Sequence, residues 1–75
     1  MKKALYERSY AAFTELLKEE RKKAGLTQAK LARKLRRPQS YVSKYERGDR
    51  RLDVVEFLEV ARAIGFDPNE FLQKL

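Results

Sequence analysis

Basic side chains are the most numerous chemically active groups in this sequence of 75 residues. Residues 21–51 contain twelve Lys and Arg against two acidic residues, Glu46 and Asp49, so this stretch has a net charge of +10. Residues 1–20 are neutral overall, and residues 52–75 carry a net charge of −3. Cations at this density bind polyanions, and nucleic acid is the first candidate. An anionic lipid surface or a plain solubilising surface is the alternative.

Catalytic chemistry is poorly supported by the residue types. The chain contains no Cys, no His and three Ser, so it offers neither a thiol nucleophile nor an imidazole base, and neither a disulfide nor a zinc site. It also contains no Asp-rich loop of the kind that binds Mg²⁺ or Ca²⁺. We therefore expect a protein that is not an enzyme and that holds no metal and no cofactor.

The distribution of charge along the chain argues against a membrane protein. No run of uncharged residues is longer than six, whereas a membrane-spanning helix needs about 18 or more apolar residues. The basic residues near the N-terminus are not followed by the apolar core of a signal peptide. A length of 75 residues suits one hydrophobic core. We expect a single domain over residues 1–75, located in the cytoplasm.

Five stretches have apolar residues every three to four positions, which predicts an all-helical fold. Gly25, Gly48 and Gly65 each follow such a stretch, and glycine suits the left-handed residue just past a helix end. No stretch alternates apolar and polar residues long enough for a strand. We predict a compact all-α bundle of about five short helices, over residues 9–24 (or from residue 3), 27–35, 38–47, 53–65 and 68–75.

Helix starts are marked by capping residues. Thr27 is expected to cap the second helix, and Asp53 with Glu56 forms a capping box at the start of the fourth. The predicted inner stripe of the fourth helix contains Val54, Phe57, Leu58, Ala61 and Ile64.

The connection between the second and third helices is the most informative spacing. Only Arg36 and Arg37 separate Leu35 from Pro38, so the two helices must turn sharply. Two short helices joined in this way, at about 90–120°, form a helix-turn-helix, and the second helix is then free to enter the major groove of DNA. Ala32 is small enough for the third helix to cross closely. We place the helix-turn-helix at residues 27–47.

The same residues resemble a known family. Residues 26–35 (LTQAKLARKL) and 38–48 (PQSYVSKYERG) are similar to the phage repressor/Cro-type helix-turn-helix proteins, often called XRE-type regulators. The resemblance extends from about Phe13 to Ile64. It implies a lambda-repressor-like fold and a transcription regulator that binds double-stranded DNA in a sequence-specific manner, on the nucleoid, with the third helix in the major groove.

The resemblance also implies which residues contact bases. Gln39, Ser40 and Lys44 would lie on the groove-facing side of the third helix. Their chemistry suits this role, because Gln pairs with adenine, Lys donates to guanine and Ser contacts several bases. The alternative for Gln39 and Ser40 is that they only cap the helix. Tyr41 and Ser43 are secondary candidates, and the alternative for Tyr41 is a packed aromatic. Val42 and Tyr45 are assigned to the core.

Phosphate contacts are expected for seven further side chains, and plain solvation is the alternative for Arg36 and Arg37. By resemblance, Gln28 contacts a phosphate and braces Gln39. Lys30 stands where the family usually has glutamate, and Arg36 stands where it usually has glycine in a left-handed turn. A non-glycine residue there costs roughly 1 kcal/mol. The complete set of expected phosphate contacts is Gln28, Lys30, Arg36, Arg37, Arg47, Arg50 and Arg51.

Two structural pairings complete the prediction. The family often pairs an arginine of the first helix with a glutamate near the end of the third, and Arg21 and Glu46 stand at those places. The alternative is a solvated surface pair that contributes under about 1 kcal/mol. A dimer interface is expected on the C-terminal helix, at Phe66, Phe71, Leu72 and Leu75. In the alternatives these residues cap the monomer core, or Leu5, Tyr6 and Tyr10 form the interface.

These expectations define a function. We predict a repressor that binds a palindromic operator as a homodimer. The first alternative is an antitoxin-like or controller protein that also binds a protein partner, although no tail for such a partner is evident. The second is a protein–protein module that has lost DNA binding, which the basic stretch disfavours.

Overall fold

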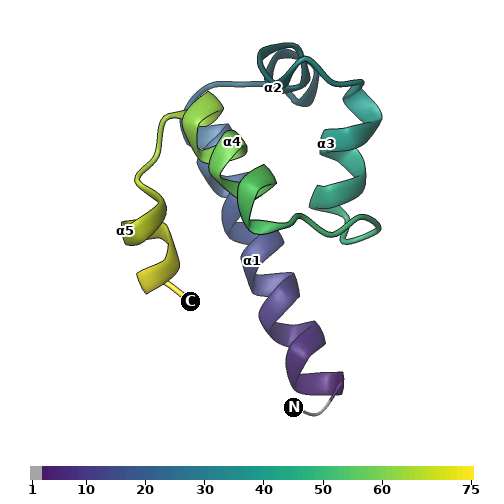
Figure 1. Cartoon of the computed structure of the whole chain (residues 1–75), viewed down its shortest axis with the longest axis vertical. Coiled ribbons are helices and arrows are strands. Elements are labelled where there is room, and N and C mark those ends of the chain that lie inside the picture. The colour runs from purple at the N-terminus through teal and green to yellow at the C-terminus, as the bar shows by residue number, and fades with distance from the viewer. Residues whose placement is uncertain (1–2) are drawn as a thin grey trace.

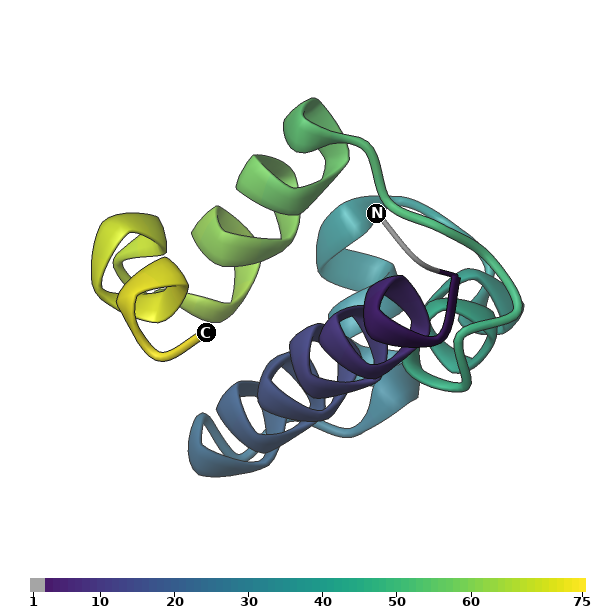
Figure 2. The same cartoon turned by 90° about the horizontal axis from the view of Figure 1, so that it is seen from below.

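Five helices make up the part of the chain that the computed structural model describes, which is the backbone of residues 3–75 and the side chains of residues 7–75. The helices are α1 (Lys3–Lys23), α2 (Gln28–Leu35), α3 (Gln39–Glu46), α4 (Val54–Ile64) and α5 (Pro68–Gln73). No strand occurs in these residues, so the predicted all-α fold is confirmed. The long α1 runs along the molecule, and α3 and α5 lie on opposite sides of it in both views (Figures 1 and 2).

The helix starts follow the predicted capping. The Thr27 hydroxyl accepts a hydrogen bond from the Lys30 N–H at 3.1 Å at the start of α2. At the start of α4, the Asp53 carboxylate accepts from the Glu56 N–H at 2.7 Å, and the Glu56 carboxylate accepts from the Asp53 N–H at 3.0 Å. This is the expected capping box, which satisfies two backbone donors that the helix itself leaves free.

The turn of the helix-turn-helix is left-handed at Arg36, as the resemblance implied. Arg36 has φ 57° and ψ 43°, and no other non-glycine residue of the described backbone has a positive φ. The Arg36 N–H donates to the Arg33 carbonyl, and the Arg37 N–H donates to the Ala32 carbonyl at 3.0 Å. These two bonds end α2 and turn the chain within two residues, so that α2 and α3 pack against each other across the buried Ala32.

The core lies between α1 and the four shorter helices. Its fully buried side chains include Leu17, Leu31, Val42, Tyr45 and Val60. An aromatic group attaches α5 to this core. The Phe71 ring lies 4.9 Å from Phe66, 5.4 Å from Phe57 and 5.8 Å from Phe13, centroid to centroid.

Burial corrects two sequence-based assignments. Phe71 is 1% exposed within the monomer, so its side chain cannot reach a second copy, and its predicted place in a dimer interface is wrong. Phe66 is partly buried against the same core. Conversely, Val54 and Leu58 were expected on the inner stripe of α4, but both are exposed, Val54 by 73%. Five rings from α1, α4 and the α5 region make up the core on this side, and Val54 and Leu58 lie at the edge of an open groove beside them.

Candidate nucleic-acid interface

One side of α3 is solvent-exposed and polar. Gln39, Ser40 and Lys44 are exposed there, whereas Val42 and Tyr45 on the opposite side are buried in the core as predicted. Ser43 is half-buried, and its hydroxyl donates to the Ser40 carbonyl at 3.2 Å. The helix therefore presents an amide, a hydroxyl and an ammonium group side by side, which are the groups that hydrogen-bond to base edges.

A buried ion pair holds α3 in place. Arg21 Nε donates to Glu46 Oε2 at 2.7 Å, and Arg21 Nη2 donates to Glu46 Oε1 at 3.1 Å. The two side chains are 9% and 3% exposed, so the predicted pair is confirmed in its buried form. Arg21 Nη1 also donates to the Leu26 carbonyl at 2.8 Å. The hydrogen bonding of its guanidinium to the Glu46 carboxylate is the main reason why the pKa of Arg21 is raised.

Gln28 braces a different residue from the one expected. Its side-chain Nε2 donates to Glu46 Oε1 at 3.0 Å, and Gln39 makes no side-chain hydrogen bond to any residue with a described side chain. A carboxylate is a stronger acceptor than a neutral amide, and the buried Glu46 has lone pairs left after pairing with Arg21. Gln28 thus fixes the start of α2 against the end of α3, while Gln39 points into solvent unrestrained by it.

Three of the seven expected phosphate-binding residues form ion pairs that sequence reasoning missed. Arg50 binds the Glu56 carboxylate with both Nη atoms, at 3.2 and 2.8 Å. Arg37 Nη2 lies 3.7 Å from Glu59, and Arg47 Nε donates to Asp49 at 3.0 Å on the surface. Lys30, Arg36 and Arg51 are exposed. Arg50 lies in the loop before α4 and Glu56 lies in α4. Helix periodicity does not predict a contact between a loop residue and a helix residue, so this pair could not be found from the sequence.

A basic hollow of about 570 Å³ adjoins the exposed side of α3. Its charged and polar lining comes from the turn before α3, from α3 itself and from the loop after it. We call it the α3 hollow, and its members include Arg36, Arg37, Ser40, Tyr41, Lys44 and Arg50.

The ring of Tyr41 belongs to the protein interior. Tyr41 is 7% exposed, which favours the packed alternative over the predicted contact with a base. The guanidinium carbons of Arg37 and Arg50 lie 4.4 and 4.6 Å from its ring centroid. Tyr41 follows Ser40 by one residue, a rotation of about 100° around the helix, which takes its ring away from the exposed side. Burial is the main reason why the pKa of Tyr41 is raised.

The loop after α3 is anchored to α1 through Tyr10. The Leu52 N–H donates to the Tyr10 hydroxyl oxygen at 2.9 Å, and the Arg51 guanidinium carbon lies 5.0 Å from the Tyr10 ring centroid. The sequence did not predict this role for Tyr10, because an aromatic residue on the apolar side of a helix is normally assigned to the core or to an interface. Of the alternative dimer patch, the Leu5 and Tyr6 side chains lie outside the described residues.

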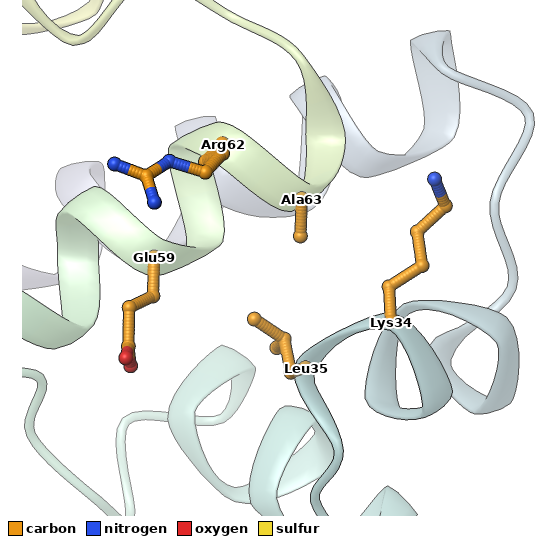
Figure 3. Close-up of a pocket in the computed structure, with 5 residues that line it drawn as sticks. All are labelled: Lys34, Leu35, Glu59, Arg62 and Ala63. Atoms are coloured by element: carbon orange, nitrogen blue, oxygen red, sulfur yellow. The ribbon is translucent and has the colours of Figure 1, made fainter.

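A second hollow lies between α2 and α4 (Figure 3). Lys34 and Leu35 approach it from α2, and Glu59, Arg62 and Ala63 approach it from α4. Its charged groups have both signs, and among the described side chains Lys34, Glu59 and Arg62 form no hydrogen bond or ion pair with one another, since Glu59 pairs with Arg37 instead. It has fewer basic side chains than the α3 hollow, two against four.

Comparisons with known proteins agree with this geometry. A family model described as Helix-turn-helix matches residues 17–71. A solved structure, the XRE-family like protein from Pseudomonas syringae pv. tomato str. DC3000, is 50% identical over 96% of this chain and 88% of that chain, with a TM-score of 0.91. This chain belongs to the XRE-type helix-turn-helix family. No curated protein sequence matches it.

Membership in the XRE-type family defines the general activity. This helix-turn-helix fold is that of DNA-binding transcription regulators. Among the residues that the structure describes, no helix is both long enough and apolar enough to cross a membrane.

Proposed function

We propose that this protein is a transcriptional repressor that binds a palindromic operator as a homodimer and reads each half-site with α3. The exposed side of α3 carries the proposal: Gln39, Ser40 and Lys44 project from it beside the basic α3 hollow. Side chains that read bases thus adjoin cations that bind the backbone, the division of labour seen in specific DNA complexes. The protein would act in the cytoplasm, on the chromosome.

The proposed contacts divide by chemistry. Gln39 would pair with an adenine and Lys44 with a guanine, with Ser40 between them. Ser43 remains a secondary candidate, because its hydroxyl is used on the Ser40 carbonyl. The proposed phosphate contacts are Gln28, Lys30, Arg36, Arg37, Arg47, Arg50 and Arg51.

The proposed dimer interface lies on the α5 side. Leu72, 49% exposed, and Leu75 are exposed on and after α5, and Val54, Val55 and Leu58 are exposed on α4. Val54, Leu58 and Leu72 line an apolar groove, together with Phe13 and Phe57 among others. Large exposed apolar patches mark interaction sites. Phe66 would contribute at the margin.

The position of this groove suits a two-fold dimer on DNA. In the direction that separates α5 from α3 in Figure 1, the chain measures 25 Å. Two copies that meet through their α5 sides would place their α3 helices at the far ends of the dimer. A separation of about 34 Å, one turn of DNA, then lies within twice the width of a monomer.

The same groove supports one other function. An antitoxin-like or controller protein would use an exposed apolar groove for a protein partner while α3 binds DNA. The oligomeric state distinguishes the two functions, because a repressor dimer buries the groove with a second copy. A monomer whose groove is covered only by another protein would favour the controller function.

Selection from random duplex DNA followed by footprinting tests the proposal. We expect an enriched palindrome with half-site centres one helical turn apart. Gln39→Ala should lower affinity for the selected site by roughly 1–3 kcal/mol and relax preference at one or two positions. Glu19→Ala, an exposed change on α1, is the control. An unchanged consensus in Gln39→Ala would contradict base reading by α3.

A further inference from the structure

We propose that Tyr41 and Glu56 are positioning residues that hold Arg37 and Arg50 as a clamp for one backbone phosphate of the bound DNA. The inference rests on the proposed DNA binding, and it assigns a ligand to the α3 hollow. It also gives a function to Tyr41, whose buried ring does not reach the bases.

Tyr41 brings together two arginines that are distant in sequence. Arg37 comes from the turn before α3 and Arg50 from the loop after it, and both guanidinium groups lie against the same ring. Their carbon atoms are therefore no more than about 9 Å apart. The ring is held by the core, and it meets the buried Tyr45 edge to face at 5.8 Å. Guanidinium groups stacked on a fixed ring lose little further freedom when they bind.

Glu56 orients Arg50 without exhausting its donors. Arg50 uses one Nη1 hydrogen and one Nη2 hydrogen on Glu56, and its other Nη1 hydrogen on the Arg51 carbonyl. A guanidinium has five N–H groups, so one on Nη2 and the one on Nε are left for an anion. Glu56 is itself fixed, because it also accepts from the Asp53 N–H at the start of α4.

Arg37 supplies the other half of the clamp. Its Nη2 lies 3.7 Å from Glu59, which is an ion pair without a hydrogen bond. None of the guanidinium N–H groups of Arg37 donates a hydrogen bond to a residue in the described part of the chain, so the planar donor edge of the side chain is available. That edge matches two phosphate oxygens.

The surroundings of the clamp carry a net positive charge, which suits an anionic ligand such as a phosphate. Arg37 and Arg50 are balanced by Glu59 and Glu56, so the net positive charge of the α3 hollow comes from Arg36 and Lys44. The Ser40 hydroxyl adds a neutral donor at the edge of the base-reading side. A phosphate in this position would therefore belong to the DNA strand whose bases α3 reads.

The salt dependence of binding to a duplex of unrelated sequence tests the shared clamp. The slope of log K against log[salt] reports the number of phosphates neutralised. Arg37→Gln and Arg50→Gln should each flatten the slope by about one unit or less, and the double variant by about one unit in total, with affinity lowered roughly tenfold. Arg62→Gln, which removes an exposed cation on α4, is the matched control and should leave the slope unchanged.

Variants of the positioning residues test their role separately. Tyr41→Phe keeps the ring and should bind like the wild type, whereas Tyr41→Leu should reproduce the double arginine variant. Glu56→Gln should weaken binding like Arg50→Gln. If Tyr41→Leu fails to fold by circular dichroism, the surface variants still decide the question.

Several outcomes would overturn the clamp. Unchanged slopes in Arg37→Gln and Arg50→Gln would remove both from the phosphate, and a loss of about two units in the double variant would mean two separate phosphates. Tighter binding by Glu56→Gln would make Glu56 a competitor of DNA. If the NMR shifts of the arginine Nε–H groups titrate to saturation with micromolar inorganic phosphate, the ligand of the hollow is a free anion. Failure of the wild type to bind any duplex would instead refute the proposed function.

Discussion

Arg21 and Glu46 form a two-pronged ion pair that joins the last turn of α1 to the last residue of α3. Gln28, the first residue of α2, donates to the same carboxylate. The helices α1, α2 and α3 therefore meet at the buried carboxylate of Glu46. The position of α3 relative to α1 and α2 therefore depends on a polar contact as well as on apolar packing.

Removing one partner of this pair should be costly. Arg21→Ala leaves the Glu46 charge buried without its partner, and we expect a loss of about 3 kcal/mol or more in the free energy of unfolding, measured by urea denaturation. Asp49→Ala, which breaks the exposed pair with Arg47, is the control and should cost less than about 1 kcal/mol. Equal effects from the two changes would show that the buried pair has no special weight.

Stability should fall in acid partly through Glu56. Its hydrogen bonds from Arg50 and from the Asp53 N–H lower its pKa from 4.5 to about 2. A carboxyl with a depressed pKa in the folded state stabilises the fold above its unfolded value, and this contribution is lost as the pH falls from about 4.5 towards 2. Glu56→Gln should flatten the pH dependence of the urea midpoint in this range. An identical profile in wild type and variant would contradict the assignment.

Tyr45 carries a polar atom in an apolar place. Its hydroxyl oxygen is buried and makes no hydrogen bond to any residue that the structure describes, and burial raises the pKa of the group. Tyr45→Phe removes the unsatisfied group and keeps the ring, so we expect a gain of about 1 kcal/mol in the free energy of unfolding. A clear loss of stability would show that the hydroxyl finds a partner in solution.

Arg36 occupies a left-handed position that favours glycine. Arg36→Gly should raise stability by roughly 1 kcal/mol because it relieves backbone strain. Arg36→Ala keeps the strain and should give no such gain. Both variants lose the same side chain, so both should weaken DNA binding to a similar extent. A drop in melting temperature for Arg36→Gly relative to Arg36→Ala would contradict the strain argument.

Leu72 is the sharpest probe of the proposed dimer. Leu72→Glu places a charge on the exposed side of α5 without disturbing the core. We expect a folded monomer by sedimentation, with unchanged helical circular dichroism and a far greater loss of operator binding than of non-specific binding. Gln73→Glu adds the same charge beside it and is the control. If wild type and Leu72→Glu sediment as the same species, α5 is not in the interface.

Features set by neighbouring residues could be predicted from the sequence. Helix periodicity, the Thr27 cap and the capping box at Asp53 each depend on contacts within a few residues, and each was found where expected. The left-handed Arg36 was expected only from the family resemblance. The Arg21–Glu46 pair was also found, although it spans 25 residues, because the family resemblance supplied a contact that spacing could not.

The features that escaped prediction depend on how the helices pack. Periodicity places Tyr41 on the same turn as the base readers and Phe71 on the same helix as Leu72, but only the crossing of α3 and α5 over the core decides which of them is buried. Likewise, the sequence does not show which arginines of the basic stretch form ion pairs and which stay unpaired. The sequence alone determined the five helices and a cationic α3 region, whereas the tertiary structure decided which cations are paired and which side chains face solvent. That choice depends on distances between separate elements, which local sequence does not encode.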